Sequence, residues 1–170
     1  PAEVKMSKRA QQAILEEGEK LRSRGVWNVE TVQEWSIVAA EARRRGEIAH
    51  VGHILLICSV KHSELPEGDE RRIYKGRIVF GGNMVRDEEG AFAIFGEISS
   101  TPTTHEASKV GDAYTMQPDE DGEEFVVEGS DADQAYVQSE LKGPPTWVRL
   151  PNALQPASWA QYRDPVCRLV

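Results

Sequence analysis

The chain has 170 residues, of which 39% are hydrophobic and 28% are charged, with a net charge of −8. These values are typical of one globular domain large enough to bury a core, and they exclude intrinsic disorder. The longest apolar run, residues 54–58, is too short to cross a bilayer. Two cysteines are too few for a disulfide framework and no secretory signal pattern opens the chain, so we expect an intracellular setting, in the cytoplasm or nucleus.

The first segment, residues 1–47, is predicted to be helical. Apolar residues at a 3.6-residue period predict one helix over residues 5–24, ended by Gly25, and a second over residues 29–45, ended by Gly46. Asn28 and Thr31 offer oxygens that can cap the second helix. The arginine run near its end, residues 43–45, either complements the helix dipole or contacts a phosphate.

The second segment, residues 48–100, is predicted to contain a β-hairpin. Branched apolar residues predict strands over residues 51–60 and 73–80, separated by a turn-rich stretch at residues 65–69. Side chains alternate along a strand, so Lys75 and Arg77 share one face. Two cations on one face either bind a phosphate chain or only face water. None of the four histidines has a zinc-ligand spacing, and we interpret them as structural or surface residues.

The third segment, residues 101–170, is predicted to combine helices and short strands. Residues 103–116 have a good helix start and are expected to bury Ala107, Val110, Ala113 and Tyr114. Residues 146–150 alternate as a strand that Pro151 stops. The chain begins with Pro1 and ends on an apolar run, and both ends suggest a fragment of a longer protein.

Between these elements lies the stretch with the most chemistry, residues 125–138. Its short apolar strand is followed at once by Asp131 and Asp133, and then by Tyr136. Either an aspartate caps a helix through Tyr136, or a carboxylate at a strand tip holds a metal ion.

Charge is unevenly distributed. Residues 119–140 carry nine acidic side chains and no basic one, whereas residues 71–86 carry five basic side chains and no acidic one. The net charge of −8 does not favour nucleic-acid binding, so such binding would depend on where the basic residues lie. The two stretches either face one cleft or form two separate solvated surfaces.

Taken together, three segments resemble the copia-type reverse transcriptase of long-terminal-repeat retrotransposons. The hairpin residues are similar to the family's fingers pattern Tyr-Lys-Ala-Arg-Leu-Val, residues 106–113 resemble the palm helix, and residues 130–141 resemble the first catalytic motif. The resemblance covers roughly residues 26–170. The matching hairpin sequence is Tyr74-Lys75-Gly76-Arg77-Ile78-Val79-Phe80-Gly81-Gly82-Asn83.

The resemblance implies a role for each matching residue. Asp131 would be the first metal-binding catalytic aspartate, and the Ala132 carbonyl would bind the same Mg²⁺. Tyr136 would stack under the deoxyribose and exclude a 2′-hydroxyl. Lys75 and Arg77 would lie near the incoming triphosphate.

The family's second pair of aspartates, in a Tyr-x-Asp-Asp hairpin, does not occur in these 170 residues. We therefore expect an α+β fold with N-terminal helices, a fingers-type β-hairpin and a partial palm. The expected function is that of a fragment of an RNA-directed DNA polymerase that binds template–primer and dNTP and is inactive alone. The alternative is a retroelement-derived, non-catalytic structural or interaction subunit with a protein partner. Neither function involves a membrane.

Overall fold

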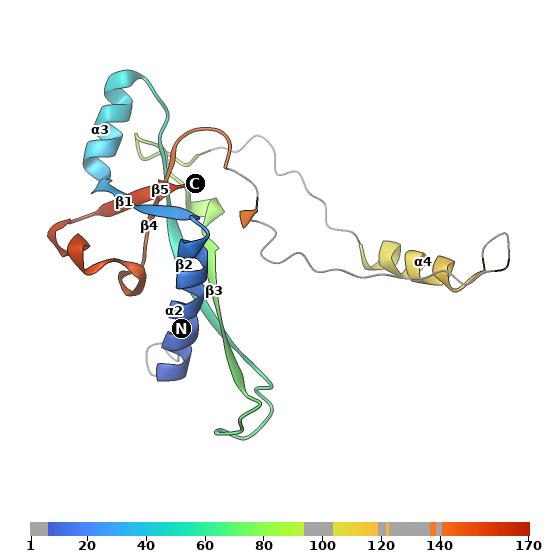
Figure 1. Ribbon diagram of the computed structural model, residues 1–170. Coiled ribbons are helices and arrows are strands. Elements are labelled where there is room, and N and C mark those ends of the chain that lie inside the picture. The colour runs from blue at the N-terminus through green and yellow to red at the C-terminus, as the bar shows by residue number, and fades with distance from the viewer. Residues whose placement is uncertain (1–6, 94–103, 119–121, 123–136, 139–140) are drawn as a thin grey trace. The chain divides into compact units, whose positions relative to one another are not determined.

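The computed structural model describes residues 7–93, 104–118, 122, 137–138 and 141–170 (Figure 1). Contacts divide the chain into two units, Pro1–Ala93 with Glu140–Val170, and Ile94–Ser139. These boundaries differ from the three sequence segments 1–47, 48–100 and 101–170, because the end of the chain joins its beginning in one sheet.

The protein is α+β, as the sequence predicted. Its described helices are α2 (Lys8–Ser23), α3 (Trp35–Arg45) and α4 (His105–Thr115), with the short 3-10 turns η1 (Gly82–Met84), η3 (Asn152–Leu154) and η4 (Ala157–Gln161). The strands are β1 (Trp27–Glu34), β2 (His50–Lys61), β3 (Ile73–Phe80), β4 (Thr146–Arg149) and β5 (Pro165–Leu169).

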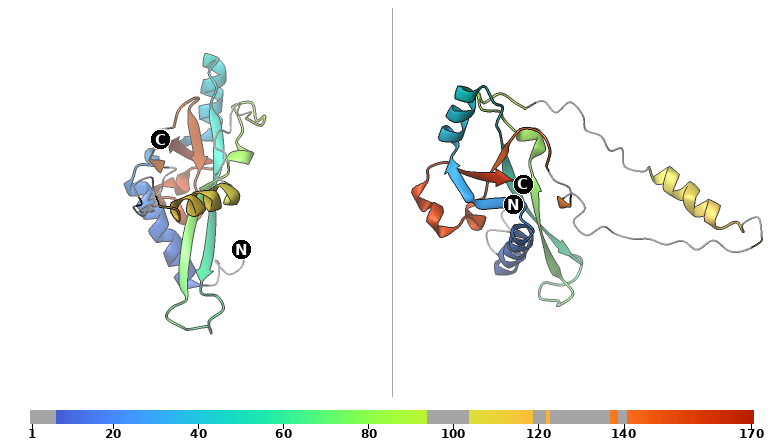
Figure 2. Two further views of the ribbon diagram at one scale, coloured as in Figure 1. Left: turned by 90° about the vertical axis from the view of Figure 1, so that its right-hand side faces the viewer. Right: turned by 45° about the horizontal axis from the view of Figure 1, so that its top comes forward.

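The five strands form one mixed sheet in the order β1-β5-β4-β2-β3. β2 links its two halves: residues 50–53 pair in parallel with β4, and residues 54–61 pair antiparallel with β3. The β2–β3 hairpin therefore extends beyond the other strands, as Figure 1 and the two views of Figure 2 show. This hairpin and its two strands confirm the sequence prediction.

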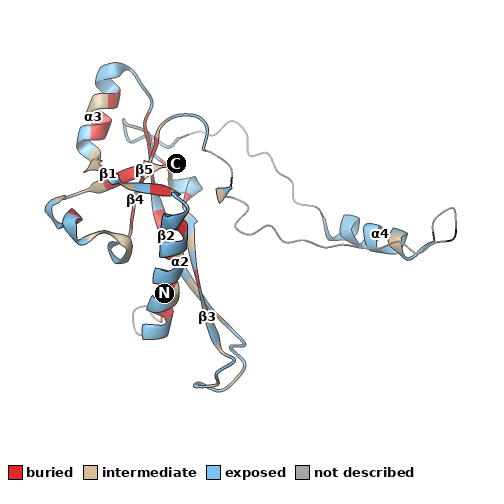
Figure 3. Ribbon diagram, viewed as in Figure 1, coloured by how far each residue is buried: buried red, intermediate tan, exposed pale blue. Residues whose placement is uncertain are grey.

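The two N-terminal helices pack on opposite faces of the sheet. Val51 of β2 belongs to the core under α3, together with Val38, Ala42, Ala49 and Val166. Gly76 of β3 contacts α2 instead. Gly76 pairs with Cys58 of β2, which lies an odd number of residues from Val51. Cys58 and Gly76 therefore lie on the face of the sheet opposite to Val51. Figure 3 shows buried residues along one side of each of these two helices. The hairpin extends past the part of the sheet that α3 covers, and its face on the α3 side is exposed there.

The predicted helix over residues 29–45 is wrong over residues 29–34. Residues 27–34 form β1, and α3 begins only at Trp35. β1 contains the β-branched residues Val29, Thr31 and Val32, and it pairs with β5 at the far end of the chain. Thr31 does not cap a helix, because its hydroxyl accepts the Arg168 N–H at 2.9 Å. A long-range pairing overrides the local helical pattern.

The other helix predictions agree better with the structure. α2 lies within residues 5–24, and α3 ends as expected at Gly46, which has a left-handed φ of 66°. The three arginines are exposed but have partners within the protein: Arg43 donates to the Glu88 carbonyl, and Arg44 and Arg45 pair with Glu41. These contacts favour the structural interpretation of residues 43–45 over phosphate binding.

α4 forms where it was predicted, but the prediction that it is buried is wrong. Thr104 caps it by accepting the Ala107 N–H at 3.2 Å. Val110 is 69% exposed and Tyr114 is 65% exposed, and no residue of this helix is buried.

The two cysteines differ in environment, and we expect them to differ in reactivity. Cys167 on β5 is 0% exposed, and burial raises the pKa of its thiol to about 12. Cys58 on β2 is half-buried. Because the thiolate is the reactive form, iodoacetamide at about pH 8 should modify only Cys58 in the folded protein. Mass spectrometry before and after urea unfolding checks this, and equal labelling of both cysteines in the folded protein would contradict it.

Candidate nucleic-acid interface

The candidate site is the exposed face of the β2–β3 hairpin, which we call the open hairpin face. It consists of alternate residues of the two strands: Leu55, Ile57, Ser59 and Lys61 of β2, and Ile73, Lys75, Arg77 and Val79 of β3. Three of the eight are cations and none is acidic, although the whole chain has a net charge of −8. This face is therefore a local cationic surface on an acidic protein.

Lys75 and Arg77 lie next to each other on this face, as their spacing predicted. Lys75 is opposite Ser59 and Arg77 is opposite Ile57 on β2. Both are exposed, and neither makes a hydrogen bond or an ion pair with a described residue. Both ammonium and guanidinium groups are thus free to bind an anion.

The packing of α2 determines which way these two side chains point. Gly76 lies between them on the opposite face, where the Ala13 carbonyl and the Ile14 backbone of α2 approach closely. Since only glycine leaves room for this helix, the register of β3 is set with Lys75 and Arg77 on the exposed side.

The remaining cations of residues 71–86 have other roles. Arg71 forms a two-pronged contact with Asp69 at the hairpin tip, at 3.0 and 2.8 Å. Its guanidinium holds the pKa of the Asp69 carboxyl below its usual value. Arg86 donates to the Gly90 carbonyl at 2.6 Å and lies 4.2 Å from the Phe92 ring centroid. Arg72 lies on the other side of the hairpin, in a groove beside α2.

The residues expected at the catalytic centre, Asp131, Ala132 and Tyr136, lie outside the described residues, as does Asp133. In the described part of the chain, no three His, Cys, Asp or Glu side chains come together as metal ligands. A two-metal site requires several carboxylates, and the sequence contains no Tyr-x-Asp-Asp motif. The residues present do not make up the magnesium centre that the resemblance implies, and we assign no step to the metal.

The structure also contains a charged cluster that the sequence analysis missed. Arg149 of β4 donates two hydrogen bonds to Asp164, at 2.7 and 2.8 Å, and lies over the Trp35 ring. His53 on β2 is directly opposite Arg149 in the sheet. The residues are distant in sequence, and no local pattern indicates that they meet. The cluster joins β2, β4 and the segment before β5.

This cluster gives stability a defined pH dependence. Hydrogen bonds from Arg149 lower the pKa of Asp164 below 3.8, so its contribution is present above that value and is lost as pH falls through the lower folded pKa. Burial, and then Arg149, lower the pKa of His53 below 6.5. The unfolded state therefore gains the His53 proton first, and stability falls as pH decreases below about 6.5.

We expect His53→Gln to flatten the decline of stability between about pH 6.5 and pH 5, measured as the urea midpoint at each pH. His105→Gln, on the exposed surface of α4, is the control and should leave the decline unchanged. An unchanged pH profile in His53→Gln would mean that His53 does not cause the decline of stability.

Comparison with known proteins adds no relative: no protein-family model, characterised protein or solved structure matches the chain. Among the described residues, no helix is long and apolar enough to span a membrane.

Proposed function

We propose that this chain is the fingers and early palm portion of a copia-type RNA-directed DNA polymerase that acts inside the cell. In this proposal the open hairpin face binds the phosphates of a template–primer and of the incoming dNTP through Lys75 and Arg77. The observation that carries the proposal is this pair of exposed, adjacent cations on a face with no acidic residue.

The order of the elements also supports the proposal. The hairpin β2–β3, the helix α4 and the strand β4 follow one another at the positions where the resemblance expects a fingers hairpin, a palm helix and a short strand. Asp131 and Ala132 would supply only one part of a metal site, and Tyr136 would contact the sugar, as the resemblance implies. Because the downstream aspartate pair is not in these residues, we assign binding rather than catalysis to them.

The test is the affinity for a fluorescent template–primer, measured by anisotropy at low salt. The variant Lys75→Gln/Arg77→Gln removes both cations of the open hairpin face. The matched control, Lys20→Gln/Arg22→Gln, removes the same charge from exposed positions on α2. Binding that is lost only in the first variant supports the proposal, and equal binding by both variants overturns it.

A second function, a non-catalytic interaction subunit, is favoured by the aliphatic residues of the same face. Leu55, Ile57, Ile73 and Val79 are 45%, 44%, 56% and 40% exposed. Exposed aliphatic side chains among cations suit an acidic protein partner as well as a nucleic acid. A purified chain that binds no template–primer at low salt would favour this second function.

A further inference from the structure

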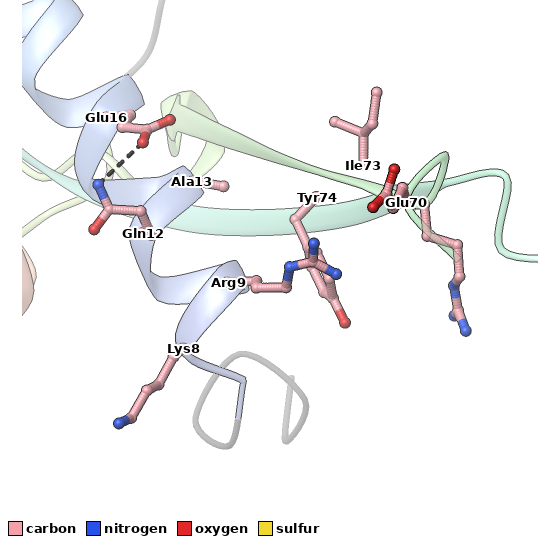
Figure 4. A pocket seen from close by; sticks show the side chains of 9 residues that line it. Lys8, Arg9, Gln12, Ala13, Glu16, Glu70, Ile73 and Tyr74 are labelled. Carbon is pink, nitrogen blue, oxygen red and sulfur yellow. Dashed lines mark hydrogen bonds between the residues drawn. The ribbon is translucent and has the colours of Figure 1, made fainter. Parts of the chain in front are cut away.

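A second cationic feature lies on the other side of the hairpin, between the start of α2 and the start of β3. It is a groove of about 510 Å³ (Figure 4). The residues that line it are Lys8, Arg9, Gln12, Ala13, Glu16, Glu70, Arg72, Ile73 and Tyr74. Neither Lys75 nor Arg77 lines the groove, although Ile73 belongs both to its lining and to the open hairpin face.

Cations from two elements surround this groove. Lys8 and Arg9 come from the first turn of α2, which contains no acidic residue, and Arg72 comes from the hairpin. In Figure 4 the Arg9 side chain extends toward the strand that carries Tyr74, whereas Lys8 points away along the rim. Two acids, Glu16 and Glu70, also line the groove, and Glu16 accepts a hydrogen bond from Gln12 at 3.0 Å. Cations therefore outnumber acids by three to two.

The shape of the groove favours a polymer over a small ligand. Six of its nine lining residues are exposed and none is buried, whereas a site for a small molecule encloses about 70–90% of its ligand. Single-stranded nucleic acids bind instead in open cationic grooves that offer aromatic rings for the bases. The half-buried Tyr74 supplies such a ring beside the three cations.

The position of β3 connects this groove with the open hairpin face. β3 is the last strand of the sheet, so its outer edge pairs with no described strand. Tyr74 lies on the α2 side of β3, and its neighbour Lys75 lies on the open hairpin face. Cations thus occur on both sides of one edge strand.

We propose that a single strand of nucleic acid passes around the edge of β3 and occupies this groove, with its phosphates near Arg9 and Arg72 and a base on Tyr74. The inference rests on the proposed function, and it adds a second contact region to the open hairpin face. It assigns Arg9, Arg72 and Tyr74 to nucleic-acid binding.

The test compares oligo(dT) of about 4 and about 12 nucleotides, a range typical of single-strand sites, by anisotropy at several salt concentrations. Lys8→Gln/Arg9→Gln should weaken binding of the longer strand by up to about tenfold and reduce the salt slope by about 0.7, because Arg9 is the one of these two cations placed near a phosphate. Its effect on the shorter strand should be smaller. Lys20→Gln/Arg22→Gln is again the control with equal charge, and it should bind both strands like the unmodified chain.

Photo-cross-linking on the unmodified chain tests the same inference without any variant. A 5-iodouracil oligonucleotide should cross-link to Tyr74, as mapped by mass spectrometry. Absence of a cross-link in residues 8–16 or 72–74, with unchanged affinity of Lys8→Gln/Arg9→Gln, overturns the inference. Polyglutamate that displaces oligo(dT) at equal charge concentration also overturns it, in favour of an acidic protein partner.

The outcomes separate this inference from the proposed function. Loss of binding in Lys75→Gln/Arg77→Gln alone supports the proposed function and overturns the inference that the groove binds nucleic acid. Loss in Lys8→Gln/Arg9→Gln alone supports the groove and overturns the role of the open hairpin face.

Discussion

Gly76→Ala should destabilise the protein by about 3 kcal/mol, the upper end of the cost of over-packing a core. An added Cβ would lie 2.4 Å from the Ala13 carbonyl oxygen and 2.9 Å from the Ile14 Cα. These are backbone atoms of α2, so no side-chain rotation relieves the clash, and the helix must move away from the sheet. The close approach of α2 explains why this position is glycine.

Urea unfolding, followed by circular dichroism, measures this effect. Gly82→Ala is the matched control, because an added Cβ there meets nothing within 4 Å and the residue has no positive φ. Gly52→Ala is a useful intermediate, since its clash is with the Phe80 side chain, 2.3 Å away. If Gly76→Ala unfolds at the same urea concentration as Gly82→Ala, α2 does not pack on β3 as described.

Lys75→Gln/Arg77→Gln should reduce the affinity for a template–primer by roughly 10-fold to 100-fold at low salt, since each charge-assisted hydrogen bond contributes about 1.5 kcal/mol or less at an exposed site. The slope of log K against log salt should decrease by about 1.8, because two phosphate contacts are lost on a duplex. Stability should hardly change, as neither side chain bonds to a described residue.

The salt slope distinguishes a direct phosphate contact from a general charge effect. The control Lys20→Gln/Arg22→Gln changes net charge equally and should leave the slope unchanged. A loss of affinity with an unchanged slope in the Lys75 and Arg77 variant would mean that the two cations do not contact phosphates.

Local patterns predicted several elements correctly. The branched apolar runs of β2 and β3, the turn-rich stretch between them and the short strand before Pro151 each correspond to an observed element. The alternation of Lys75 and Arg77 onto one face followed from strand geometry alone. Capping residues located the start of α4 and the end of α3. These features depend on neighbours within a few residues, which the sequence displays directly.

Long-range contacts explain where the structure differs from the sequence predictions. β1 was predicted as a helix because its pairing partner β5 lies more than 130 residues away, and no local pattern indicates that pairing. The Arg149–Asp164 pair opposite His53 and the groove between α2 and β3 likewise combine residues that only the folded sheet brings together.

The amino-acid order was thus sufficient to specify the β2–β3 hairpin and the shared face of Lys75 and Arg77, because strand periodicity and turn chemistry are local properties. That this face is exposed while the opposite face receives α2 was decided by tertiary packing. The backbone of Ala13 fits against β3 only at Gly76, and this single close approach leaves the two cations free for a ligand.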